Sequence, residues 1–232
     1  MMRQFGIKNE FGIDYVNWLD MYSSDPDVQT NPQRYETGGN VFLWVKDKNL
    51  FAFKGIGPEA TYSANLNILL EYFCEKLSIL LTDDPFPVAT KATNAVDMMD
   101  EIKLIDGPDN DITKYLDLDW SKVDMEIRGK IDRWNDCHGI YTNRDGSFLP
   151  DLYIRKVKNQ IEISWHNDFA HRSDEGEVYF EYEKGVEYVD LKLFKETVVA
   201  FCLDLINRFQ KNYPEQMNRY RTALQRAIDL PV

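Results

Sequence analysis

The sequence lacks the features of membrane and secreted proteins. No window reaches the run of about 18 uncharged apolar residues that a membrane-spanning helix requires. The N-terminal stretch MMRQFGIKNEFGIDYV has neither a continuous apolar region nor a small-residue cleavage site, so we expect no signal peptide. The three cysteines, Cys74, Cys137 and Cys202, are far apart and odd in number, which argues against a disulfide framework. We therefore expect a cytoplasmic protein with reduced cysteines and no membrane contact.

Basic residues are scarce relative to acidic ones. Lys and Arg number 27 and Asp and Glu number 39, which gives a formal net charge of -12. A surface of this charge repels phosphate backbones, so the composition disfavours nucleic-acid binding. It favours a basic protein as the partner, because complementary charge speeds encounter and fixes orientation.

Complete catalytic and cofactor motifs are also missing. The sequence contains no glycine-rich phosphate loop, no G-x-S-x-G elbow, no C-x-x-C pair and no H-E-x-x-H helix. Cys137 and His138 precede His166 and His171, but their spacing does not match a typical set of metal ligands. We therefore expect no cofactor and no metal, and the motifs do not favour an enzyme.

The first half contains one strand pattern and one strong helix pattern. Apolar runs at 41–46 and 50–54 flank a polar turn, which predicts a hairpin. Leucines recur at spacings of three and four over 63–82, which predicts a helix capped by Ser63. The sequence also predicts a short helix around 94–102.

The connections around these elements are polar. The stretch 23–40 is dense in turn-forming residues and predicts a loop. Further along, Ser121 is expected to open a helix, and Gly139 to end it in a left-handed conformation.

The C-terminal region combines a second hairpin pattern with two helices. A polar turn is predicted at 171–176, followed by a strand at 177–183 and a tight turn at Lys184-Gly185. The next residues, 186–189, are either the return strand or a lead-in to the following helix. Asp190 is placed to cap a long helix, and Pro214 to occupy the first position of the last helix.

Together these patterns predict an α+β fold, in which antiparallel β-hairpins pack against amphipathic helices and two helices end the chain. The proline- and acid-rich stretch at about 83–120 has the character of a joint. We predict an N-terminal hairpin-plus-helix subdomain over 1–120, which includes this acidic joint, and a C-terminal α+β subdomain over 121–232.

The most regular pattern is a tight hairpin that starts near Pro150 and turns at 158–159. Pairing outward from this turn places apolar side chains on one face and polar side chains on the other. The polar face then carries three cross-strand pairs: Tyr153 with Ser164, Arg155 with Glu162, and Asp151 with His166. Such pairs set register more than they stabilise.

This hairpin resembles that of the PD-(D/E)xK nucleases, because Pro150-Asp151 is followed on the next strand by Glu162. The resemblance implies that Asp151 and Glu162 hold Mg²⁺. It also implies a lysine two residues after the glutamate, where this sequence has Ser164, and leaves Arg155 as the nearby cation. A degenerate metal-dependent nuclease domain is therefore an alternative function.

The strongest charge asymmetry lies at 97–126, where ten acidic residues face three lysines for a net charge of -7. A solvated connecting loop would account for it. We favour a non-enzymatic interaction surface that meets a basic partner. Its predicted contact residues are Asp97, Asp100, Glu101, Asp106, Asp109, Asp111, Asp117 and Asp119.

The order of elements from Arg133 to Trp165, followed by a strand and a long helix, resembles accessory proteins of bacterial defence and immunity loci. That resemblance implies an immunity, antitoxin or antiviral defence-accessory role. A DNA-mimic inhibitor is a further alternative, which would need carboxylates at phosphate-like spacing.

The C-terminal helix is locally basic, and its arginines could pair with the 97–126 carboxylates within one molecule or between two, as in a homodimer.

Overall fold

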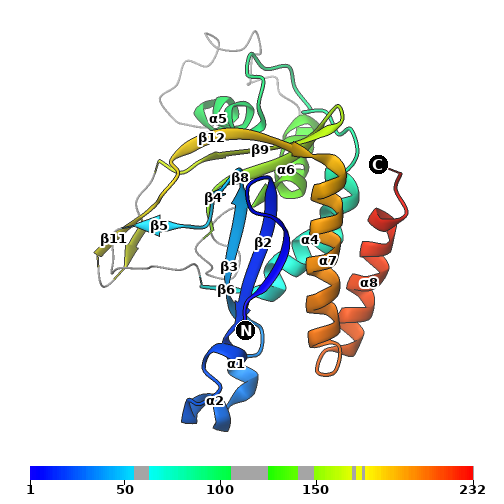
Figure 1. The fold of residues 1–232 in the computed structure, drawn as a ribbon. Coiled ribbons are helices and arrows are strands. Elements are labelled where there is room, and N and C mark those ends of the chain that lie inside the picture. Colours follow the sequence, from blue (N-terminus) through cyan, green and yellow to red (C-terminus); the bar gives the residue numbers. More distant parts are fainter. Residues whose placement is uncertain (55–62, 106–124, 141–148, 169–170, 174–175, 232) are drawn as a thin grey trace.

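The computed structural model describes residues 1–54, 63–105, 125–140, 149–168, 171–173 and 176–231. It confirms the predicted α+β class, with antiparallel sheets, amphipathic helices and two C-terminal helices, α7 (Leu191–Phe209) and α8 (Pro214–Ile228) (Figure 1). In these ranges, no helix combines the length and the apolar character needed to cross a membrane.

The N-terminal region forms one antiparallel sheet built from five strands: β1 (Arg3–Ile7), β2 (Phe11–Asn17), β3 (Gly38–Val45), β4 (Lys48–Asn49) and β6 (Ser63–Asn65). The hairpin predicted at 41–46 and 50–54 is only partly right. Its second strand ends at Asn49, because the chain turns there and the N–H of Ala52 donates to the Asn49 carbonyl at 2.9 Å. The next strand, β5 (Phe53–Lys54), pairs with β11 (Gly176–Phe180) instead.

The prediction of a loop at 23–40 is wrong, because polar residues in this stretch cap short helices. α1 (Trp18–Met21), α2 (Pro26–Thr30) and α3 (Pro32–Tyr35) connect β2 to β3 and project from one end of the sheet (Figure 1). Asp25 accepts a hydrogen bond from the N–H of Asp27 at 2.8 Å. Proline at the first helical position then fixes the backbone in the helical range.

The predicted leucine-rich helix is present as α4 (Leu66–Leu80), but it starts later than expected. Ser63 belongs to β6 and pairs with Asn40 of β3, so it is not available as the cap. Asn65 takes that role by accepting a hydrogen bond from the N–H of Asn67 at 3.0 Å. The leucine stripe is buried, as its period predicts.

The second large sheet has the order β12-β9-β8-β7, with β7 (Gly139–Ile140), β8 (Leu152–Val157), β9 (Gln160–His166) and β12 (Lys184–Asp190). The predicted hairpin register is confirmed, since Arg155 pairs with Glu162 and Tyr153 with Ser164.

The turn predicted at Lys184-Gly185 and the return at 186–189 are wrong, whereas the alternative is right, because β12 leads directly into α7. Lys184 and Gly185 lie inside β12, which pairs with β9 and not with β11. The polar turn predicted at 171–176 contains a short strand, β10 (His171–Ser173), which is the partner of β11. Alternating sequence identifies β11 as a strand but not β10, and the choice of neighbour depends on contacts with distant segments.

Helix α6 (Met125–His138) ends directly before Gly139, as predicted. The left-handed conformation predicted for Gly139 is wrong. Gly139 is the first residue of β7 and has strand backbone. A Cβ atom at this position would lie 2.8 Å from the Asn135 carbonyl oxygen and 3.1 Å from the Tyr153 ring. Close packing therefore explains the glycine. Ser121, the predicted start of this helix, lies outside the described residues.

The main core fills the space between the two large sheets and the helices α4, α7 and α8, which lie side by side (Figure 1). It includes Phe73 from the first half and Phe201 from the second, in edge-to-face contact at 6.3 Å. A smaller core joins α5 (Ala95–Ile105) and α6 around Trp134. The main core thus draws on both sides of position 120, and the division into 1–120 and 121–232 stays a prediction.

Two glycines provide a matched test of packing. A Cβ atom on Gly185 would lie 2.3 Å from the Trp165 ring, whereas one on Gly129 in α6 would meet nothing within 4 Å. We expect Gly185→Ala to lower the free energy of unfolding by about 1–3 kcal/mol through overpacking. Gly129→Ala should raise it by about 0.5–1 kcal/mol, because alanine favours the helix. Urea unfolding of both variants measures this, and equal effects would contradict the described contact with Trp165.

Candidate functional site

The polar face of the β8–β9 hairpin is buried. Arg155 and Glu162 form the predicted ion pair, with Nη2 and Oε2 at 2.8 Å, and their side chains are 13% and 0% exposed. A carboxylate removed from water in this way is stable only when its oxygens are paired and hydrogen-bonded. Glu162 meets this condition through contacts with a segment more than sixty residues earlier in the chain.

That segment is the start of α5. The N–H of Ala95 donates to Glu162 Oε1 at 2.6 Å, and the N–H of Val96 donates to Ser164 Oγ at 3.1 Å. Arg155 also donates to the carbonyl oxygen of Thr93 at 2.6 Å. The first N–H groups of a helix have no partner within the helix and favour negative charge. The predicted polar face therefore holds α5 on the sheet.

This arrangement does not fit Glu162 as a metal ligand. Besides Ala95 and Arg155, its oxygens lie within 3.4 Å of the hydroxyls of Ser164 and Tyr188. Four donors therefore surround a fully buried carboxylate, and α5 covers it. This geometry gives no support to the metal-dependent nuclease function that the hairpin resemblance implies.

Asp151 lies where the register places it, opposite His166. Its carbonyl accepts the N–H of His166 at 3.1 Å, and its own N–H donates to Asn167 Oδ1 at 2.7 Å. The His166 ring, however, faces α5, with Nδ1 at 2.5 Å from Asp100 Oδ2. The cross-strand neighbour is confirmed, and the side chain of His166 has an acidic partner that local pairing did not reveal.

The predicted partner-binding residues fall into two groups. Asp97 and Asp100, on α5, contact Lys184 Nζ at 2.6 and 3.7 Å. The hydrogen bond from Lys184 lowers the pKa of Asp97, and Asp97 in turn raises the pKa of Lys184. Glu101 accepts a hydrogen bond from the N–H of Lys91 at 3.2 Å. The remaining five lie outside the described residues: Asp106, Asp109, Asp111, Asp117 and Asp119.

The structure adds carboxylates to this region that the sequence did not single out. Asp168 Oδ2 lies 3.5 Å from His166 Nε2 and is 62% exposed. Glu181 and Glu183 precede Lys184, and both are exposed. In the described part of the chain, neither Glu181 nor Glu183 forms an ion pair. We define the acidic edge as the five carboxylates near the start of β12: Asp97, Asp100, Asp168, Glu181 and Glu183.

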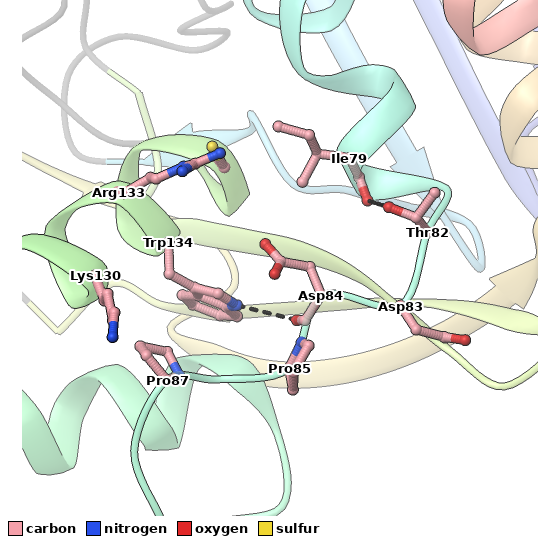
Figure 2. Close-up of a pocket in the computed structure, with 10 residues that line it drawn as sticks. Ile79, Thr82, Asp83, Asp84, Pro85, Pro87, Lys130, Arg133 and Trp134 are labelled. Carbon is pink, nitrogen blue, oxygen red and sulfur yellow. Dashed lines mark hydrogen bonds between the residues drawn. The ribbon is translucent and has the colours of Figure 1, made fainter. Parts of the chain in front are cut away.

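A separate cavity of about 430 Å³ lies between the end of α4, the 82–87 segment and α6 (Figure 2). Its wall includes the Trp134 ring, whose Nε1–H donates to the Asp84 carbonyl at 3.2 Å. Lys130 and Arg133 lie on one side of this cavity, and Asp83 and Asp84 on the other (Figure 2). The opposite charges balance, so the cavity does not select one sign of ligand charge.

His138 is buried and neighbours two residues that line this cavity, Trp134 and Cys137. Its ring stacks on Trp134 at a centroid distance of 4.3 Å, and Nδ1–H donates to the Trp134 carbonyl at 2.9 Å. Nε2 is 3.7 Å from Asp84 Oδ2. Burial lowers the pKa of His138, and this outweighs the hydrogen bond and the Asp84 charge, which act in the opposite direction. The neighbouring Cys137 is also buried, which does not fit an exposed thiol site.

Two arginines of the last two helices pair with carboxylates outside 97–126, and the predicted pairing with 97–126 stays a prediction because six of its ten carboxylates lie outside the described residues. Arg208 lies 2.8 Å from Asp20, and Arg219 lies 3.4 and 3.3 Å from Glu71 and Glu75 of α4. Within the described ranges, these arginines form no pair with the 97–126 carboxylates. Arg219 reaches Glu71 and Glu75 because α8 packs along α4.

Comparisons of the chain with protein-family models, with curated proteins and with solved structures each found no match. Function is therefore inferred from the contacts, exposure and charges of this chain.

The buried ion pair gives a direct stability test. Glu162→Ala should lower the free energy of unfolding by about 3–5 kcal/mol, because it leaves Arg155 and the α5 N–H groups without their acceptor. The double variant Arg155→Met/Glu162→Leu removes both charges and should lose less than the single variant. Chemical denaturation of the three proteins measures both values. A double variant less stable than Glu162→Ala would contradict the unpaired charge as the cause.

His138 predicts a pH effect. Its pKa is lower in the folded state, so the unfolded chain binds more protons in acid. The resulting stability is present above the ordinary histidine pKa of about 6.5 and is lost as pH falls through it toward the folded value. We expect His138→Phe, which keeps a ring against Trp134, to flatten the decline in unfolding free energy between about pH 7.5 and 5. An unchanged slope would show that other groups cause the decline.

Proposed function

We propose that this chain is a non-catalytic protein-interaction module that binds a basic partner at the acidic edge. The observation that carries the proposal is an excess of carboxylates near the start of β12. Asp97, Asp100 and Asp168 contact the side chains of Lys184 or His166, and Glu181 and Glu183 lie in the exposed segment directly before Lys184. Counting these five carboxylates against the ammonium group of Lys184 gives a charge of -4. A cluster of one sign attracts oppositely charged proteins and orients them.

The remaining polar groups support a binding role over a catalytic one. Of the two hairpin carboxylates that resembled a metal site, Glu162 is fully buried and accepts a hydrogen bond from the start of α5. The cavity beside Trp134 has balanced charge and does not favour a single class of small molecule. A DNA-mimic inhibitor, which would present carboxylates to a basic protein at phosphate-like spacing, stays an alternative.

The biological setting that we propose is the one predicted from the sequence. An immunity, antitoxin or antiviral defence-accessory protein works by covering the surface of another protein, and an acidic edge suits a basic target. The three buried free cysteines agree with a cytoplasmic location.

The acidic edge can be tested by neutralising its three most open carboxylates. We expect Asp168→Asn/Glu181→Gln/Glu183→Gln to weaken binding of fluorescein-labelled oligolysine by about tenfold at low salt, from the loss of three surface interactions. Raising the salt concentration should weaken the unmodified chain in the same way. Fluorescence anisotropy measures both.

The control variant has the same change in net charge at exposed positions elsewhere: Asp132→Asn, Glu215→Gln and Asp229→Asn. Its binding should stay close to that of the unmodified chain. An equal loss in both triple variants would mean that overall charge, and not the acidic edge, attracts the peptide.

A further inference from the structure

The acidic edge borders an open edge of a β-sheet. β12 is seven residues long and is paired along one side with β9. Within the described residues it has no second strand neighbour, whereas the strand at the opposite edge of this sheet, β7, has two residues. Among the sheet edges that the structure describes, β12 is the longest.

The hydrogen bonds show which backbone groups of β12 face outward. The N–H of Asn167 donates to the carbonyl of Glu183 at 2.6 Å, so Glu183 is in a hydrogen-bonded position toward β9. Antiparallel pairs alternate, so the positions that follow it at even spacing also bond to β9. The N–H and C=O groups of Lys184, Val186 and Tyr188 therefore point away from the sheet.

The usual protections of a sheet edge are weak on this strand. Exposed edges are commonly guarded by charged side chains, proline or a distorted backbone. The ammonium group of Lys184 is bound by Asp97, and Glu187 pairs with Lys48. By contrast, the edge strand β1 contains Gly6 with φ of 76°, which breaks the regular strand geometry.

The side chains of β12 add an apolar contact surface beside these backbone groups. Val186 and Tyr188 are each 38% exposed, although both are large and hydrophobic. Their side chains share the face of the sheet on which α5 lies, because the Tyr188 hydroxyl is 3.4 Å from Glu162 Oε2. An added strand would cover them while it formed hydrogen bonds with the outward groups.

We propose that β12 accepts an extended segment of a basic protein as a fifth strand of this sheet. This inference rests on the proposed function, since the acidic edge at the start of β12 supplies the charge that selects such a segment. Backbone hydrogen bonds would provide affinity, and alternate side chains would contact Val186 and Tyr188. A second copy of the chain fits less well, because it brings its own net charge of -12 to the same edge.

Val186→Pro tests the added strand. Proline removes an N–H that points outward, so the ladder with β9 is kept, and its ring blocks the edge. The probe is a labelled peptide in which Lys and Val alternate over the length of β12. We expect Val186→Pro to weaken its binding by about tenfold, while the matched Val186→Thr stays within about twofold. Amide exchange at Val186 and Tyr188 in the unmodified chain should slow by at least about tenfold when the peptide is bound.

A second probe does not depend on the folding of the proline variant. The same peptide, N-methylated at alternate residues, keeps its charge but loses the N–H groups of one edge, so its binding should fall. Strand addition is wrong if the methylated peptide binds the unmodified chain as tightly as the unmethylated peptide does, and if Val186→Pro binds the unmethylated peptide as tightly as the unmodified chain does. If the acidic-edge triple variant still weakens binding in that case, the proposed function stands.

Two other outcomes would also overturn the inference. If neither basic peptide binds the unmodified chain, both strand addition by a basic segment and the proposed function fail. If Val186 and Tyr188 become protected without peptide as the protein concentration rises, and Val186→Pro abolishes this, the occupant of the edge is a second copy of the chain.

Discussion

The buried contact between Glu162 and its donors is the constraint on which the second half of the structure depends. A carboxylate with no exposed surface needs a cation and hydrogen bonds together, and Arg155 alone does not supply them. The N-terminus of α5 completes the set with the N–H of Ala95. Holding α5 in this position also closes the small core around Trp134, so one ion pair fixes a helix and a hydrophobic cluster.

The same contact shapes the surface. Because α5 lies over the polar face, its Asp97 and Asp100 reach Lys184 and His166. Lys184 would otherwise guard the edge of the sheet, and it is instead held against α5. Stability and the proposed binding surface are thus linked, since the helix that satisfies the buried carboxylate also supplies Asp97 and Asp100 to the acidic edge and binds the ammonium group of Lys184.

Predictions from the sequence succeeded where the determining contacts are local. The cap of α7 by Asp190 and the start of α8 at Pro214 are set within one helical turn. The register of β8 and β9 follows from alternation and one short turn. The pairing of β12 with β9 and of β5 with β11 was missed, because the patterns of these strands do not encode which distant strand lies beside them.

For the candidate site, the sequence by itself determined that Arg155 faces Glu162 and that carboxylates are in excess near residue 97. Both follow from side-chain alternation and composition, which need no knowledge of distant contacts. Only the tertiary structure decided that this ion pair is buried, that Asp97, Asp100 and Asp168 lie beside Lys184 and His166, and that β12 forms an edge among the described strands. The physical reason is that donors more than sixty residues away in the chain determine which polar groups are removed from water.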